Sequence, residues 1–176
     1  MKDQGQDIAN AYWVLPGKLL AGGYPGDAAE ASTLRKLHRL RDLGIDSFVD
    51  LTEAGEYCLK PYAHLLSKKL SKTGGDIVYV HFPITDMDVP SKKEMIDILN
   101  RMDRELAAGR TVYLHCYGGK GRTGTVVGCF LVRHGMEGER ALETIARLRV
   151  NMPDGGLRSP ETQAQIDMVC NWSEGQ

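Results

Sequence analysis

Hydrophobic residues along the chain follow two different periods. Short runs rich in valine, isoleucine, phenylalanine and tyrosine, such as "DSFVDL" (46–51) and "RTVYLHC" (110–116), are typical of buried strands. Other segments are longer and repeat their apolar residues every three or four positions, as Leu34, Leu37 and Leu40 do, which is typical of amphipathic helices. Strands that alternate with helices predict an α/β fold with a central, mostly parallel sheet that helices flank on both faces.

Capping and turn residues indicate where these elements begin and end. Ser91 and Glu94 have the spacing of a capping box, and Ser159 followed by Pro160 has the pattern of a helix start. Gly44 is the expected C-terminal cap of the first helix. We therefore expect helices over 27–43, 61–70, 91–108, 122–135, 139–150 and 160–172, strands over 46–51, 76–84 and 110–116, and a strand pair or strand and turn within 12–26.

Size and charge restrict the class of protein. A length of 176 residues is enough for one good core, so we expect a single domain over 1–176. The formal net charge of -1 predicts neither nucleic acid nor an anionic membrane as the main partner. No segment approaches the roughly 20 apolar residues of a membrane span, and the N-terminal "MKDQGQDIANAY" contains no signal-peptide pattern. These features predict a soluble, cytoplasmic protein without stable membrane insertion.

The cysteines and histidines give no sign of a bound metal. Cys58, Cys116, Cys129 and Cys170 are widely spaced and form no CxxC pattern, which fits a reducing compartment. The five histidines form no HxxxH or HExxH spacing. We therefore expect no metal site and no other cofactor.

The segment "VYLHCYGGKGRTGT" (112–125) is dense in glycine and carries a cysteine, a lysine and an arginine. A Walker loop requires a glycine at the position of Leu114 and Ser or Thr at the position of Gly121, directly after Lys120. A GxGxxG dinucleotide fingerprint is also missing. The spacing therefore argues against a nucleotide loop.

A loop between a strand and a helix can form a cup for an oxyanion, because backbone N–H groups and the positive end of the helix dipole surround one point. Cys116 stands at the mouth of this cup, where the dipole and Arg122 favour its thiolate form, a nucleophile. Arg122 can place two donors on a tetrahedral anion, and Thr123 can offer its hydroxyl to the sulfur. A buried structural cysteine before a glycine turn is the plainer alternative, but it requires neither Arg122 nor the glycines.

The stretch "HCYGGKGRTG" resembles the signature loop of the cysteine-dependent protein tyrosine and dual-specificity phosphatases, which reads His-Cys, five residues, Arg, then Ser or Thr. The resemblance implies that Cys116 is the nucleophile and Arg122 the phosphate-binding arginine, with His115 and Thr123 in supporting roles. It also implies a dual-specificity phosphatase-like fold. The loop residues expected to bind substrate beside Arg122 are Tyr117, Gly118, Gly119, Lys120 and Gly121.

Phosphomonoester hydrolysis by this route also needs an acid that protonates the leaving oxygen. Asp86 and Asp88 follow a predicted strand in "PITDMDVP", although both are also common turn residues before Pro90. The segment is similar to the general-acid loop of the same family, and alignment of "FPI" (82–84) with that loop selects Asp86. By the same resemblance, Glu53 and either Gln163 or Gln165 are candidates for groups that orient the loop or a water molecule; alternatively, Glu53 is an exposed acid and the glutamines are ordinary residues of an amphipathic helix. Cys58 is either a disulfide partner for an oxidised Cys116 or, as we expect, an unreactive half-buried thiol.

Lys120 adds positive charge beyond what one phosphoryl group needs. It is either a solvated loop residue or a group for a substrate with several phosphates, as in the phosphatase-and-tensin branch of the superfamily. That branch also carries a basic residue where this chain has Tyr117, so the inositol-lipid reading is weaker.

These residues predict a metal-independent phosphomonoesterase that forms a phosphocysteine. Phosphotyrosine and phosphoserine or phosphothreonine in proteins or peptides are the expected substrates, and we expect a shallow site because the tyrosine-bearing recognition loop of larger tyrosine-specific enzymes is missing. Three alternatives remain open: a phosphoinositide or inositol polyphosphate phosphatase, a non-catalytic phosphate-binding module, and a sulfur- or arsenate-handling enzyme.

Overall fold

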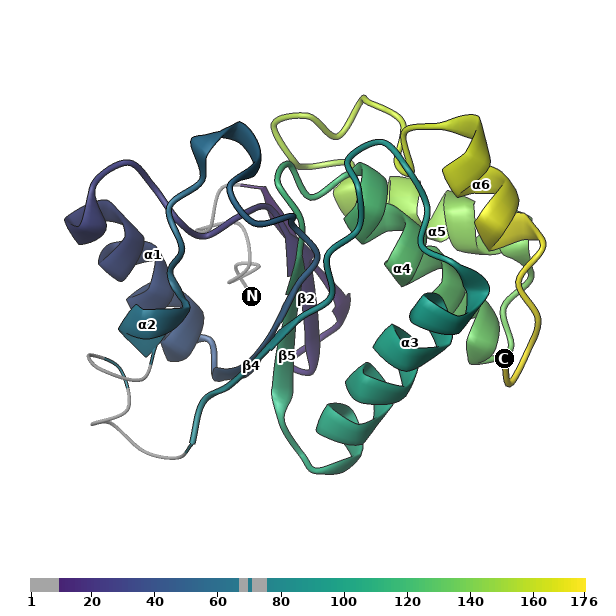
Figure 1. Cartoon of the computed structure of the whole chain (residues 1–176). Helices are drawn as coiled ribbons and strands as arrows, with labels where there is room; N and C mark the ends of the chain where they lie inside the picture. Colours follow the sequence, from purple (N-terminus) through teal and green to yellow (C-terminus); the bar gives the residue numbers. More distant parts are fainter. Residues whose placement is uncertain (1–9, 67–69, 71–75) are drawn as a thin grey trace.

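A five-stranded, mostly parallel sheet forms the centre of the molecule, as the sequence predicts (Figure 1). The computed structural model describes residues 10–66, 70 and 76–176. The strands lie in the order β1-β2-β5-β3-β4, and only β1 is antiparallel to its neighbour. Their bounds are β1 Ala11–Leu15, β2 Leu19–Gly22, β3 Ile45–Asp50, β4 Val78–His81 and β5 Thr111–His115.

Helices cover both faces of this sheet, which confirms the predicted α/β class. In Figure 1, α1 and α2 lie on one face and α3 to α6 on the other. The helices are α1 Glu30–Asp42, α2 Ala63–Leu65, α3 Lys92–Ala107, α4 Gly121–Arg133, α5 Gly138–Arg149 and α6 Gln163–Cys170, with a short 3-10 helix, η2, at Glu56–Cys58.

The two faces of the sheet have separate hydrophobic cores because neighbouring strand residues point in opposite directions. Phe48 of β3 and its register partner Tyr113 of β5 belong to the core under α1 and α2. Val49 and Leu114, the next residues along, belong to the core under α3 to α6. Both strands are thus buried on both sides, which explains their continuous apolar runs.

Some predicted bounds are wrong at loop junctions. The capping box of Ser91 does begin α3, but the last helix begins at Gln163 with Thr162 as N-cap, not at Pro160. The hydroxyl of Ser159, the expected N-cap, donates instead to the carbonyl of Lys120 at 2.8 Å. The predicted helix over 61–70 is helical as α2 at Ala63–Leu65, and its positions 67–69 lie outside the described residues.

The carboxyl ends of the three neighbouring parallel strands meet at one edge of the sheet. The amide of Leu51, after β3, donates to the carbonyl of His115, where β5 ends, at 2.9 Å. The amide of Phe82, after β4, donates to the carbonyl of Asp50 at 2.9 Å. The loops that follow these strands therefore emerge side by side, at the upper edge in Figure 1.

A row of glycines on α4 faces the C-terminal segment at very short range. A Cβ on Gly124 would lie 2.4 Å from the hydroxyl oxygen of Ser159, and one on Gly128 would lie 2.5 Å from a methyl group of Val169. These separations are well below contact distance for real side chains. The segment from Ser159 to α6 consequently packs directly on the backbone of α4.

Candidate active site

The loop between β5 and α4 has its carbonyl groups turned toward the surrounding protein. The carbonyl of Tyr117 accepts a hydrogen bond from the amide of Tyr24 at 2.9 Å, and that of Lys120 accepts from the Ser159 hydroxyl at 2.8 Å. With its carbonyls bound on the outside, the loop has its amide groups available to an anion on the inside, next to the N-terminus of α4.

Gly119 allows this loop to pass very close to β2. It has a φ of 74°, and a Cβ there would lie 2.5 Å from the carbonyl carbon of Gly22. Its own carbonyl accepts from Arg149 of α5 at 2.9 Å, and the same guanidinium binds Asp154 at 2.8 Å. Arg149 is fully buried. A distant basic side chain, not foreseen from the sequence, therefore holds the loop in shape.

Cys116 and Arg122 lie at the two ends of the loop and are both nearly inaccessible. Cys116 directly follows β5 and is 3% exposed, while Arg122 stands in the first turn of α4 and is 1% exposed. The sequence pattern thus places a thiol and a guanidinium on either side of this loop.

Arg122 is held mainly by an acid from another loop. Both terminal nitrogens bind the carboxylate of Glu56 at 2.7 Å, and one also donates to the carbonyl of Ile84 at 3.0 Å. Burial is the largest single influence on the Arg122 guanidinium and lowers its pKa. The hydrogen bonds to Glu56, together with the charges of Cys116, Glu56 and Asp86, outweigh burial and raise the pKa overall. The third nitrogen, Nε, is buried and has no hydrogen-bond partner within the described part of the chain.

The two candidate acids lie in different surroundings. Asp86 places one carboxylate oxygen 3.0 Å from Nη2 of Arg122, and its other oxygen accepts a hydrogen bond from the hydroxyl of Tyr57. The carboxylate of Asp88 instead accepts from the adjacent amide of Val89 at 2.8 Å, as a turn residue does. Of the two, the structure brings Asp86 to the cup.

His115 is buried under the cup and forms a polar chain with its neighbours. Its Nδ1 lies 3.3 Å from the carbonyl of Cys116, and its Nε2 lies 2.6 Å from the hydroxyl of Tyr62. A carbonyl only accepts, so we assign the proton to Nδ1, and Nε2 then accepts from Tyr62. Burial lowers the pKa of His115, which keeps the ring neutral.

Thr123 and Lys120 make contacts that were not predicted from the sequence. The hydroxyl of Thr123 donates to the carbonyl of Gly22 at 3.5 Å. The ammonium group of Lys120 lies 3.4 Å from Glu161 and 4.0 Å from Asp154, and its side chain is 22% exposed. Lys120 is therefore paired with two acids from the C-terminal segment, and is not a freely solvated cation.

The structure also shows the surroundings of the remaining candidate residues. The carboxylate of Glu53, a candidate to orient the loop, accepts a hydrogen bond from the hydroxyl of Thr85 at 3.2 Å, and Glu56 is the acid that contacts the arginine. Gln165 is buried and donates to the backbone carbonyl of Asp88 at 3.1 Å, whereas Gln163 binds a neighbour on its own helix. Cys58, the suggested partner for an oxidised nucleophile, is exposed and reduced.

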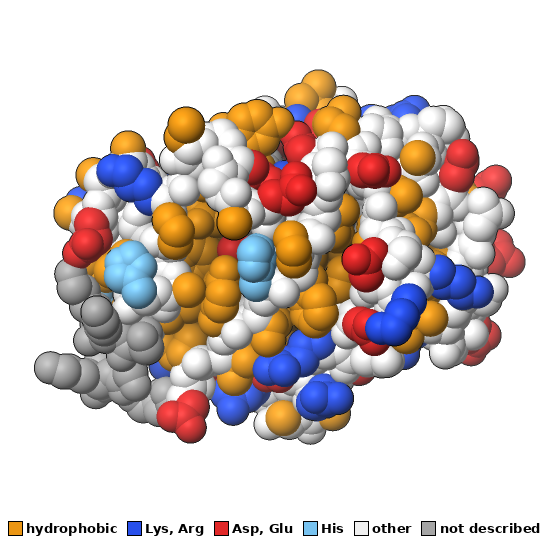
Figure 2. All heavy atoms as spheres, in the orientation of Figure 1, with side chains coloured by type: hydrophobic (Ala, Val, Ile, Leu, Met, Phe, Trp, Pro, Cys, Tyr) orange, Lys and Arg blue, Asp and Glu red, His pale blue; other side chains and the backbone are white. Residues whose placement is uncertain are grey.

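Aromatic residues line the rim of the cup. The rings of Tyr57 and Tyr117 lie 4.6 Å apart at an angle of 31°, and they are 60% and 49% exposed. Met87, next to Asp86, is also an exposed hydrophobic residue. Figure 2 shows hydrophobic and acidic side chains next to one another over the loops at the top of this face. Of these residues, only Tyr117 was expected at the site from the sequence, because the three come from separate loops.

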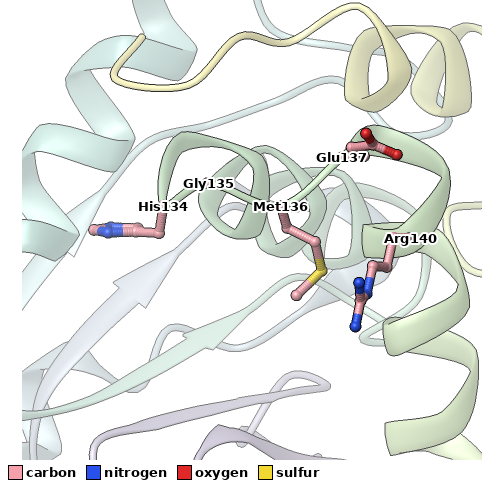
Figure 3. A pocket seen from close by; sticks show the side chains of 5 residues that line it. All are labelled: His134, Gly135, Met136, Glu137 and Arg140. Carbon is pink, nitrogen blue, oxygen red and sulfur yellow. The ribbon is translucent and has the colours of Figure 1, made fainter.

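A separate cavity of about 430 Å³ lies at the other end of α4, where the chain turns into α5 (Figure 3). Met136 and Arg140 extend to one side of the turn, while His134 and Glu137 point away from them (Figure 3). This end of α4 is about 20 Å from the cup, because a helix rises about 1.5 Å per residue. The cavity is therefore distinct from the cysteine site.

Neither a metal cluster nor a membrane-crossing helix occurs in residues 10–66, 70 and 76–176. No three His, Cys, Asp or Glu side chains among them come together as metal ligands would. None of the helices in these ranges combines the length and the apolar character needed to cross a bilayer.

Comparisons with known proteins point to one family. A family model described as "Polymorphic toxin system, DSP-PTPase phosphatase" matches residues 23–136, which is more than half of the chain. The solved structure of Tk-PTP in its active form is 27% identical, superposes with a TM-score of 0.72, and is similar over 91% of this chain and 93% of its own.

Two sequence relatives have names that differ in substrate. Protein 197R of Invertebrate iridescent virus 6, which carries a provisional tyrosine phosphatase name, is 28% identical and is matched over 89% of this chain and 61% of its own. PTEN1 of Arabidopsis thaliana, named as a phosphatidylinositol 3,4,5-trisphosphate 3-phosphatase and protein-tyrosine-phosphatase, is 30% identical over 97% of this chain and 39% of its own. The chain thus spans only part of the length of these curated relatives.

Proposed function

Because this chain belongs to the DSP-PTPase phosphatase family, we propose that it hydrolyses phosphomonoesters through a phosphocysteine intermediate. The observation that carries the proposal is the environment of Arg122. This buried guanidinium is fixed by Glu56 and retains a buried Nε with no partner among the described residues, close in sequence to the cysteine and the loop amides. An oxyanion satisfies these donors.

The first chemical step breaks the ester bond. The Sγ of Cys116 attacks phosphorus, the phosphorus–oxygen bond to the leaving group breaks, and the proton on Asp86 passes to the departing oxygen. Arg122 and the loop amides bind the non-bridging oxygens, so charge that develops on them is stabilised by fixed donors.

The second step restores the enzyme. A water molecule gives a proton to Asp86 and attacks phosphorus, the phosphorus–sulfur bond breaks, and Cys116 leaves as a thiolate with phosphate as product. The contact between Asp86 and Arg122 at 3.0 Å supports this role for Asp86, because it brings the carboxylate next to the proposed phosphate-binding arginine. The bound phosphoryl group takes over Nη2 of Arg122, and Asp86 is then free to face the leaving oxygen.

Phosphotyrosine and phosphoserine or phosphothreonine of proteins are the substrate class that we propose. The exposed rings of Tyr57 and Tyr117 suit an aromatic or peptide group better than a polyanion. Lys120 brings no net charge to the cup, since Glu161 and Asp154 lie beside it. A substrate with several phosphates therefore gains little from this lysine.

A phosphoinositide or inositol polyphosphate phosphatase is the second candidate. The similarity to PTEN1 of Arabidopsis thaliana, which is named for both lipid and protein substrates, favours it. Glu161 and Asp154 reach Lys120 from a loop and not from a rigid strand, and release of Lys120 would make the cup more basic.

The experiment compares phosphotyrosine, phosphothreonine and phosphoinositide substrates side by side in the wild type and in three variants. Cys116→Ser should abolish turnover and keep phosphopeptide binding. Asp86→Asn should lower kcat by about 10²–10³ on esters with poor leaving groups, and Asp88→Asn, its matched control, should lower it much less. Residual activity of Cys116→Ser above about a thousandth of wild type contradicts the assigned nucleophile, and a larger loss in Asp88→Asn contradicts the assigned acid. Faster turnover of the phosphoinositide than of the phosphopeptides selects the second candidate.

A further inference from the structure

Tyr57 is the residue that joins the loop after β3 to the proposed acid. Its hydroxyl donates to Oδ2 of Asp86, while Oδ1 of the same carboxylate faces Arg122 at 3.0 Å. The preceding residue, Glu56, binds Arg122 through both of its oxygens. Two consecutive side chains of η2 therefore hold the arginine and the acid at the same time.

The backbone around this contact adopts a conformation that bulky residues rarely take. Tyr57 has a φ of 48° and Cys58 a φ of 57°, and across the contact Met87 has a φ of 64°. Within the described residues, the only other non-glycine residue with positive φ is Asn10. Such conformations are strained and cluster where a function requires them. The strain here is concentrated on the two segments that bring Tyr57 to Asp86.

The ring and the proton of Tyr57 are both kept in place. The Tyr117 ring lies 4.6 Å from the ring of Tyr57, which limits its rotation although 60% of the residue is exposed. The hydrogen bond to Asp86 is the main cause of a raised Tyr57 pKa. Tyr57 therefore keeps its proton and remains a hydrogen-bond donor to Asp86.

We propose that Tyr57 is a positioning residue for the general acid: it occupies Oδ2 of Asp86, so that the transferable proton resides on Oδ1, the oxygen that faces the cup. A carboxyl group can carry its proton on either oxygen, and a donor bound to one oxygen leaves the other for the proton. The inference rests on the proposed function, because it assigns Asp86 the role of acid. It also assigns a second role to Tyr117, whose ring packs against the ring of Tyr57 and so helps to position Asp86.

The test uses two substrates that differ only in how much they need an acid. Phenyl phosphate has a poor leaving group and 4-nitrophenyl phosphate a good one, so loss of proton donation affects the first far more. For Tyr57→Phe, which keeps the ring, we expect kcat to fall about tenfold with phenyl phosphate and about twofold or less with 4-nitrophenyl phosphate. In the Asp86→Asn background the same change should have an effect below about twofold, because the two residues act as one unit.

Tyr24→Phe is the matched control, since it removes a tyrosine hydroxyl that donates to a backbone carbonyl, that of Lys60, at 3.0 Å. Its ratio of kcat values for the two substrates should equal that of the wild type. Equal losses of Tyr57→Phe on both substrates, or an undiminished loss in the Asp86→Asn background, overturn the positioning role. An inactive wild-type protein instead refutes the proposed function itself, which makes the two failures distinguishable.

Discussion

The ion pair between Glu56 and Arg122 should contribute strongly to stability, and Glu56→Gln tests this. Both oxygens of the carboxylate lie 2.7 Å from the guanidinium, and the side chains are only 8% and 1% exposed. Water therefore screens the pair poorly. The change leaves a buried positive charge with an uncharged partner, while the shape of the side chain is retained.

The expected loss of stability depends on the hydrogen-bond acceptors that Arg122 retains. Removal of one partner from a buried ion pair costs about 3–5 kcal/mol in the free energy of unfolding. Glutamine retains one acceptor oxygen, and the carbonyl of Ile84 and the carboxylate of Asp86 stay within 3.0 Å. We therefore expect a loss of about 2–3 kcal/mol, which for a chain of this length lowers Tm by about 5–10 °C.

The assay is urea unfolding followed by circular dichroism, supported by thermal melts at the same pH. Glu53→Gln is the matched control in the same loop, because its carboxylate accepts from the exposed hydroxyl of Thr85 and, within the described residues, forms no ion pair. The control should change the free energy of unfolding by about 0.5 kcal/mol or less. If Glu56→Gln is no more costly than Glu53→Gln, the reasoning about the buried pair is refuted.

Two further predictions concern the cup. Gly119→Ala should destabilise the protein and lower kcat far more than Gly17→Ala. Both glycines have positive φ, but of the two only Gly119 has backbone atoms, at 2.5 Å, where a Cβ would lie. Melting curves and aryl phosphatase assays compare the two variants. His115 should make stability fall with acidity: its pKa is lowered in the folded state, so below the unfolded value of about 6.5 only the unfolded chain takes up the proton. His115 should add about 1.4 kcal/mol per pH unit to the slope of the unfolding free energy against pH. Urea titrations between pH 7 and 5 measure this slope. If His115→Asn has the same slope as the wild type, the prediction is contradicted.

The main residues of the cup could be predicted from the sequence because they lie close together along the chain. His115, Cys116, Arg122 and Thr123 lie in one strand–loop–helix unit, and the periodicity of the residues around them correctly predicted its strand and its helix. Strands β3 and β5 were predicted because burial on both faces makes their apolar runs continuous. The apolar run at 76–84 also predicted β4, although its residues are only half-buried or exposed. Helix ends next to loops were predicted less well, because contacts such as the one from Ser159 to Lys120 compete with capping.

The partners of the cup could not be predicted, since the sheet order brings them from far along the chain. Glu56 is separated from Arg122 by 66 residues, and Arg149 from Gly119 by 30. The choice between Glu53 and Glu56 depends on the turn at Gly55, which has a φ of 79° and redirects the chain between them. Gly55 was the one local signal that could have favoured Glu56.

The glycine row on α4 makes this helix and the C-terminal segment depend on each other in evolution and in design. The family model covers residues 23–136, so it includes Gly124 and Gly128 but not the segment from Ser159 onward that they receive. A C-terminal segment transplanted from a relative can dock only if it brings side chains of the same shape. Conversely, a chain that carried alanine at Gly124 would need a different route for its last helix.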